Sequence, residues 1–341
     1  MRTRALAFAL TALFAALAAG QTSAQPDIVR VFHCNQADTE QALQEMTVVV
    51  QAIADMKIAA DTAHGAFSLR GTADQVALAE WLLNQLDQPV PSSHQPAAYA
   101  YQEAKRDPAV RVFRLTNIET PQGLNEVTAA IRTIGDISRV RPYSAQRAVV
   151  VRGTPDQAAL AEWLLNQLDQ PVSPIHESAA YDFEEANRDP AVRVFRLAHV
   201  ETKQDLQEIT NALRTLADVN RVLPYIPQGA LILRGTADQM ALAEWLVDEL
   251  DLPAGGDSAA AQSQEPADHE LQVPGSDQIV HVFHFASSTT AQQFVDIATQ
   301  ARLTAKLDRT YICFSQRALP VRGTLDQVAA TQQVVQQMFK P

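Results

Sequence analysis

Two hydrophobic patterns alternate along the chain and recur several times. Short runs of β-branched residues, such as Val149-Val150-Val151, are typical of β-strands. Each run is followed by a stretch in which apolar residues return every three or four positions. In the stretch after residue 151 these are Leu160, Trp163, Leu164 and Leu168, which share one face of a helix. The pattern therefore predicts small units that combine strands with amphipathic helices.

A segment that contains both patterns occurs four times. All four copies begin with Arg-Gly-Thr, at Arg70, Arg152, Arg234 and Arg322. Residues 78–90 and 160–172 are identical, and the starts lie 82, 82 and 88 residues apart. A period of this length indicates small tandem domains rather than the turns of a solenoid.

The repeated segment carries the signals of a strand, a tight turn and a capped helix. Gly153 permits a sharp exit from the strand. Thr154 and Gln157 form the pattern of a capping box, with Pro155 at the first helical position. Pro171 then ends the helix. The same Thr-x-x-Gln spacing recurs in the other three copies.

Upstream of this segment, each unit opens with a Val-Phe strand and a first helix capped by Thr. The capping threonines are Thr39, Thr120, Thr202 and Thr290. A hairpin follows, clearest at residues 139–152, and the segment above closes the unit. The predicted fold class is α+β: four tandem βαββα domains, each a three-stranded sheet with two helices on one face.

The pattern divides the chain into a leader, four repeats and three linkers. They are expected at residues 1–24 (leader), 25–90 (repeat 1), 91–105 (linker), 106–173 (repeat 2), 174–188 (linker), 189–253 (repeat 3), 254–275 (linker) and 276–341 (repeat 4). The first two linkers repeat an aromatic pattern and are expected to dock on a neighbouring unit; the alternative is a plain tether. The residues expected to dock are Tyr99, Tyr101, Tyr181 and Phe183. The third linker has a flexible composition, so repeat 4 is expected to move independently.

The N-terminal residues have the pattern of a secretory signal peptide. Arg2 and Arg4 precede an apolar run and small residues, which predicts cleavage before Gln25 and export to the periplasm. An uncleaved anchor is the alternative. In an exported chain Cys34 and Cys313 could form a disulfide, but Cys34 stands where other repeats have Leu, which favours a buried free thiol.

The polar residues do not form a recognisable catalytic motif. The sequence contains no GxSxG, HExxH, P-loop or CxxC pattern, so no enzyme activity, cofactor or metal is expected. His281 and His284 should point to opposite faces of a strand. The repeated arginines should pair with acids such as Asp74 or Asp156. The repeated tryptophans should pack in the core or between domains, and the alternative for Trp163 is a surface anchor for a partner. The carboxylates after the closing helices, at Asp87, Asp169 and Asp251, are expected to bind the following linker.

One strand position is a candidate interaction face. Phe113 and Leu115 should face the core, so the residue between them faces the other side. This position is occupied by His33, Arg114, Arg196 and His284 in the four repeats. The face is therefore expected to be solvated or to contact a partner.

The repeat resembles the ring-building motif of bacterial secretins, the periplasmic N-domains with a KH-like fold. The residues that carry the resemblance are Val112–Leu115, the helix after Thr120, the strand with Gly153-Thr154-Pro155, and Leu168-Asp169-Gln170-Pro171. The resemblance covers nearly all of residues 28–341, is weakest in repeat 4, and does not include the pore-forming domain of a secretin.

The resemblance implies a periplasmic scaffold that assembles with itself or with a type II secretion or type IV pilus complex. The alternative is a stand-alone envelope protein that binds a peptide or polymer along its domains. Nucleic-acid binding, which KH domains perform through a GxxG loop, is not favoured. The sequence has no GxxG and its formal net charge is −12.

Overall fold

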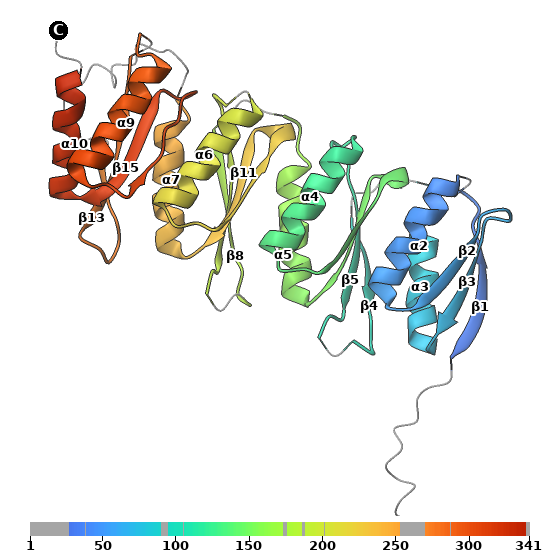
Figure 1. The fold of residues 1–341 in the computed structure, drawn as a ribbon. Coiled ribbons are helices and arrows are strands. Elements are labelled where there is room, and N and C mark those ends of the chain that lie inside the picture. Colours follow the sequence, from blue (N-terminus) through green and yellow to red (C-terminus); the bar gives the residue numbers. More distant parts are fainter. Residues whose placement is uncertain are drawn as a thin grey trace, which may run out of the picture. The chain divides into compact units, whose positions relative to one another are not determined.

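A computed structural model describes residues 27–37, 39–89, 95–104, 106–172, 176–185, 188–200, 202–252, 270–286 and 288–338. The predicted leader and its cleavage site lie outside the described residues. The chain divides into two compact units, Met1–Asp87 and Gln88–Pro341. Four antiparallel sheets alternate with helix pairs along the chain (Figure 1). The predicted α+β class with repeated βαββα elements is confirmed.

The first unit holds repeat 1, whose sheet has the order β1-β3-β2. Phe67 and Leu69 of the central strand are buried, whereas the alternating residues Ser68 and Arg70 are exposed on the opposite face. The sheet is therefore covered on one face only. The elements are β1 (Ile28–His33), α2 (Glu40–Ala54), β2 (Lys57–Asp61), β3 (Ala66–Gly71) and α3 (Ala73–Leu86).

The second unit holds the other three repeats. The elements of repeat 2 are β4 (Ala97–Ala100), β5 (Ala109–Arg114), α4 (Pro121–Ile134), β6 (Arg139–Tyr143), β7 (Ala148–Gly153) and α5 (Pro155–Leu168). Those of repeat 3 are β8 (Glu177–Asp182), β9 (Ala191–Arg196), α6 (Lys203–Leu216), β10 (Arg221–Tyr225), β11 (Ala230–Gly235) and α7 (Ala237–Leu250). Those of repeat 4 are β12 (Glu270–Gln272), β13 (Gln278–His284), α9 (Ala291–Ala305), β14 (Arg309–Thr310), β15 (Ala318–Thr324) and α10 (Leu325–Met338).

Three of the sheets have a fourth strand, which corrects the prediction of three strands per repeat. Strands β4, β8 and β12 come from segments that the sequence indicated as linkers, and each pairs with the opening strand of the following repeat. The alternation of aromatic and small residues in the first two linkers has the period of a strand. Its pairing partner, however, is set by tertiary structure.

The helix layers of repeats 2 and 3 are each covered by two sheets. The cluster built from α4 and α5 includes Phe113 and Val149 of its own sheet, and Val192, Val194 and Ile232 of the next sheet. The corresponding cluster of repeat 3 includes Val280 and other residues of repeat 4. Repeat 4 therefore packs against repeat 3, which corrects the expectation of independent movement; residues 254–269 of its linker lie outside the described part.

The role of Gly153 also differs from the prediction. Its backbone φ is not positive, so the turn itself does not require glycine. A Cβ atom at this position would lie 2.7 Å from Oε1 of Gln157. Gly71 stands in the same relation to Gln75, also at 2.7 Å. Glycine therefore makes room for the glutamine of the capping box.

Candidate interaction surfaces

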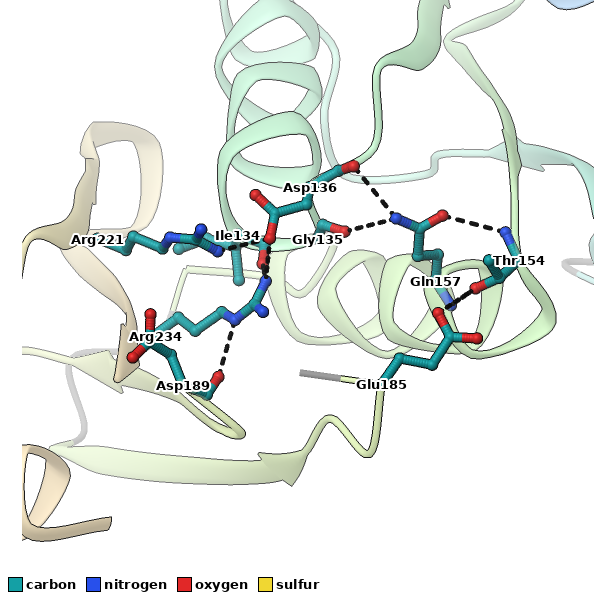
Figure 2. Close-up of polar contacts among 9 residues, drawn as sticks. All are labelled: Ile134, Gly135, Asp136, Thr154, Gln157, Glu185, Asp189, Arg221 and Arg234. Carbon is teal, nitrogen blue, oxygen red and sulfur yellow. Dashed lines mark hydrogen bonds and ion pairs between the residues drawn. The ribbon is translucent and has the colours of Figure 1, made fainter. Parts of the chain in front are cut away.

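An arginine clamp joins repeat 2 to repeat 3 (Figure 2). Arg234 donates from Nη1 to the carbonyl oxygen of Ile134 at the end of α4, and to Oδ2 of Asp136 at 3.0 Å. Arg221 donates to the same carboxylate oxygen at 2.7 Å. The side chain of Arg234 is 5% exposed. Burial lowers its pKa, and the charge of Asp136 counteracts this effect.

The same clamp joins repeat 3 to repeat 4. Arg322 donates from Nη1 to the carbonyl oxygen of Leu216 at 2.7 Å and to Oδ2 of Asp218 at 2.8 Å. Arg309 donates to this carboxylate at 2.6 Å. Asp136 and Asp218 have φ values of 53° and 56°, in the left-handed region that Asp tolerates better than most residues. In each clamp, one pair of arginines therefore donates hydrogen bonds both to a carbonyl group at a helix C-terminus and to the aspartate carboxylate.

Hydrogen bonds of the capping-box glutamine, Gln157 in repeat 2 and Gln239 in repeat 3, hold the acceptor side of each clamp within its own repeat. Gln157 accepts the N–H of Thr154 as part of the capping box and donates from Nε2 to the carbonyls of Gly135 and Asp136, both at 3.1 Å (Figure 2). The hydroxyl of Thr154 also donates to Glu185 of the following segment at 2.6 Å. The repeated glutamine thus fixes the turn that presents the aspartate.

The carboxylates after the closing helices bind a different loop from the one predicted. Asp169 accepts the backbone N–H groups of Thr116, Asn117 and Ile118 at 2.7–2.9 Å. These residues lie between the first strand and first helix of the same repeat, not in the following linker. Asp87 accepts three N–H groups of residues 35–37 in the same way. In repeats 1, 2 and 3 the aspartate of the Leu-Asp-x-Pro motif therefore joins the end of the closing helix to the loop after the first strand.

The four residues of the predicted interaction face have different surroundings. Arg196 is buried and donates to Glu177 at 2.7 Å and to the carbonyl of Gln167 in repeat 2. His284 lies 3.2 Å from Glu249 of repeat 3. Arg114 is half-buried, and burial lowers its pKa. His33 is exposed. In repeats 3 and 4 this position therefore contacts the preceding repeat and is not solvated.

The aromatic residues of the linkers lie against ordered neighbours. The ring of Tyr181 is 5.3 Å from that of Trp163, and the ring of Phe183 lies 4.8 Å below the guanidinium of Arg234. Tyr101 lies 4.5 Å below Arg152, and Tyr99 is half-buried in β4. Arg152 and Arg234 therefore stack on linker aromatics. The repeated arginines do pair with acids, as predicted, but Arg70, Arg234 and Arg322 bind Asp27, Asp136 and Asp218, not Asp74 or Asp156.

Both cysteines are free thiols. Burial, together with the charge of Asp87, raises the pKa of Cys34 to about 12, and burial raises that of Cys313. Cys34 is half-buried rather than fully buried, which corrects the prediction at that residue. A protonated thiol is a weak nucleophile and metal ligand. Neither residue has the chemistry of a reactive site.

Titratable residues do not gather into a catalytic or metal-binding group in the described residues. No three His, Cys, Asp or Glu side chains lie close enough there to hold a metal ion. His281 and His284 lie on opposite faces of β13. A hollow of about 520 Å³ in repeat 2 is lined by Arg114, Glu162 and Asp169, but the last of these already binds backbone N–H groups. Among the described helices, none is long and apolar enough to cross a membrane.

The aspartates of the clamps are the functional residues that the sequence did not reveal. Gly135-Asp136 indicated only the end of a helix. The available signal was the recurrence of Asp at the same position in three repeats, as Asp55, Asp136 and Asp218. The arginines that bind Asp136 and Asp218 lie 85 to 104 positions further along the chain, so the pairing itself required the tertiary structure.

Comparison with known proteins finds similarity only to solved structures. No family model and no curated protein matches the chain. It is similar to the N-terminal domain of the secretin XcpQ from Pseudomonas aeruginosa, with 18% identity and a TM-score of 0.19 over 43% of this chain and 62% of that chain. It is similar to Aeromonas hydrophila ExeD, with 15% identity and a TM-score of 0.17 over 67% of this chain and 42% of that one.

A structure described as XcpQN012 is covered over its whole length and matches 67% of this chain, with 16% identity and a TM-score of 0.23. The matching structures therefore include secretin N-terminal domains, the class that the repeated motif resembles. The chain spans less than two thirds of the ExeD and XcpQ chains. Similarity at this level indicates neither an activity nor a partner.

Proposed function

We propose that this protein is a non-enzymatic scaffold of the bacterial envelope that binds protein components of a secretion or pilus assembly. The observation that carries the proposal is the repeated use of one surface. In repeats 3 and 4 the outer face of the sheet is a docking face for a helix pair. The same fold presents this face in repeat 1, where Val29 and Val31 are 67% and 59% exposed.

The location follows from the sequence of the leader. A charged start, an apolar run and small residues before Gln25 direct a protein to the export machinery. The mature protein then acts in the periplasm. N-terminal sequencing of protein from the envelope fraction should find Gln25, and an intact Met1 there would instead indicate a membrane anchor.

The alternative of a binder for an extended peptide or polymer is less favoured. Such a protein needs a continuous open surface along its domains. The outer sheet faces of repeats 3 and 4 are buried against the preceding repeats, with Val194 and Val282 each 1% exposed. These two faces are not open to a polymer.

Cross-linking in the native cells tests the function. The full chain, tagged at its C-terminus, should be recovered from cross-linked cells in a stoichiometric complex with an envelope protein. The same complex should be absent from a strain that expresses the tagged chain without its leader. Recovery of the chain alone, as a monomer, would contradict the scaffold function.

A further inference from the structure

The outer sheet face of repeat 1 matches two faces that already bind helix pairs. We call Val29, Val31, Lys57 and Arg70 the repeat 1 face. Residues equivalent to its valines are buried in repeats 3 and 4. These are Val192, Val194, Val280 and Val282, all at 0–1% exposure. The repeat 1 face thus exposes apolar surface, whereas the equivalent surface of repeats 3 and 4 is buried.

The cations of the repeat 1 face have the same register as the clamps. Lys57 pairs with Arg70 across the hairpin, as Arg221 pairs with Arg234. Arg139 with Arg152 and Arg309 with Arg322 have the same register. In repeats 3 and 4 these pairs bind an aspartate beyond the end of a helix in the preceding repeat. The repeat 1 face therefore carries the donor half of a clamp.

The side chain of Arg70 is arranged as in the occupied clamps. Its Nε donates to Asp27 at 3.2 Å, and the side chain is 65% exposed. In repeat 4, Nε of Arg322 donates within the repeat to Gln278, at 2.9 Å, while Nη1 reaches the preceding repeat. The Nε edge of the guanidinium thus holds the side chain within its own repeat, and the Nη1 atom binds the preceding repeat.

We propose that the repeat 1 face binds a second protein that presents a pair of helices, the first of which ends in an aspartate. This proposal rests on the proposed scaffold function and specifies its docking surface. The partner's aspartate takes the place that Asp136 has against Arg221 and Arg234. Its apolar helix surface covers Val29 and Val31.

Docking of repeat 4 of a second copy on the repeat 1 face is opposed by one residue. Repeats 1, 2 and 3 have Asp at the position that follows the first helix, whereas repeat 4 has Lys306, which is exposed and has a φ of 51°. Docking of repeat 4 on the repeat 1 face would place Lys306 against Lys57 and Arg70. Like charges at an interface suppress pairing. The backbone conformation does not explain lysine here, because Asp adopts it more readily.

A protein partner fits the face better than a phosphate polymer. Two cations alone would suit any anion, but here they flank two exposed valines that need apolar cover. The chain as a whole has a formal net charge of −12, which repels nucleic acid and anionic membranes. The combination favours a helix pair with a single carboxylate.

A charge exchange in the purified mature protein tests the proposal. The probe is the full chain with Lys306→Asp, which presents a helix pair ending in aspartate. Sedimentation velocity should show head-to-tail association of this variant with an apparent Kd at least about tenfold below that of the wild type. Adding Arg70→Glu to the same chain should return it to the wild-type sedimentation. Lys57→Glu is a second, independent change on the face and should have the same effect.

The controls separate a specific contact from a change in net charge. Lys203→Asp alters the charge equally at an exposed position of α6, and should leave sedimentation unchanged. The proposal is overturned if Lys306→Asp does not associate, or if its association survives both Arg70→Glu and Lys57→Glu. Association of the wild type through the repeat 1 face would identify a second copy as the occupant and overturn it as well. Cross-linking to an envelope protein in cells would still support the scaffold function in each of these cases.

Discussion

Trp163 lies at a boundary between two repeats, half-buried and 5.3 Å from the ring of Tyr181. Replacement by Ala should lower the free energy of unfolding by about 2–3 kcal/mol, below the roughly 3–5 kcal/mol of a fully enclosed aromatic residue, because part of the ring already contacts water. Chemical denaturation followed by circular dichroism measures the change. Trp163→Phe, which keeps a ring against Tyr181, should lose less than half as much. An unchanged stability would show that the ring contributes no packing.

Asp169 acts at the same scale by accepting three backbone N–H groups of one loop. Asp169→Asn should lower the free energy of unfolding by about 1.5–3 kcal/mol, because a charged acceptor contributes more than a neutral one. The amide group of asparagine would also place N–H donors next to the backbone N–H donors of the loop. Thermal melts of the full chain measure the loss. Asp182→Asn, at an exposed strand position, removes the same charge and should change stability little. Equal effects of the two substitutions would attribute the loss to net charge.

At the scale of elements, the clamp connects the end of one helix to the hairpin of the next repeat. Asp136→Asn keeps a residue that tolerates the left-handed conformation but removes the charge that Arg221 and Arg234 share. It should destabilise the second unit by about 1–3 kcal/mol, since Arg234 is buried while the carboxylate is half-exposed. Chemical denaturation followed by circular dichroism measures this change in the free energy of unfolding.

Lys306→Asn provides the matched control for the clamp. It places the same residue in the same backbone conformation, at a position where no clamp is formed. This substitution should be neutral or slightly stabilising, because asparagine is favoured over lysine in the left-handed region. If Lys306→Asn lowered the free energy of unfolding as much as Asp136→Asn does, the destabilisation would come from the change at the helix end and not from loss of the contact with the arginines.

His176 connects the segment before β8 to the end of α7. Burial alone would lower its pKa, but the hydrogen bond and charge of Asp251, with Asp248, raise it above its ordinary value. His199 also bonds to Asp251 and faces the same carboxylate. A raised folded-state pKa means that protonated His176 adds stability that is fully present below about pH 6.5 and is lost as pH rises through the folded-state pKa.

The pH dependence of unfolding tests this assignment. Between pH 5 and 8, at steps of about half a unit, the wild type should lose more stability on alkalinisation than His176→Gln does. His33→Gln, which changes an exposed histidine of the first unit, should retain the wild-type profile. Parallel curves for all three proteins would show that His176 is not the titrating group.

For the whole molecule, the shared clusters determine how many parts unfold together. Residues of repeats 2 and 3 share one core cluster, and residues of repeats 3 and 4 share another. We expect the second unit to unfold in one transition, because loss of one repeat uncovers the helix layer or sheet face of its neighbour. The first unit should unfold separately. Calorimetry combined with hydrogen exchange resolves the two; separate transitions for α4 and α6 would contradict the shared core.

The elements of each repeat could be predicted from the sequence because their causes are local. Thr154 and Gln157 cap a helix wherever they occur at that spacing, and a run such as Val149-Val150-Val151 favours a strand. The closing helix predicted from the stripe of Leu160 and Leu168 extends over the expected residues. Repetition of these signals established the number of repeats and the α+β class.

Tertiary structure decided what each repeat does to its neighbours. The sequence indicated that Arg196 and His284 lie on an outer face, but not that this face is buried on the preceding repeat. It contained Asp136 and Arg234 without linking them, because the two are 98 positions apart and their contact depends on the packing of two folded repeats. Local signals act over a few residues, whereas a docking face arises only when whole sheets and helix layers meet. For that reason the sequence by itself determined the repeats, and the tertiary structure decided which faces they bury and which one remains exposed.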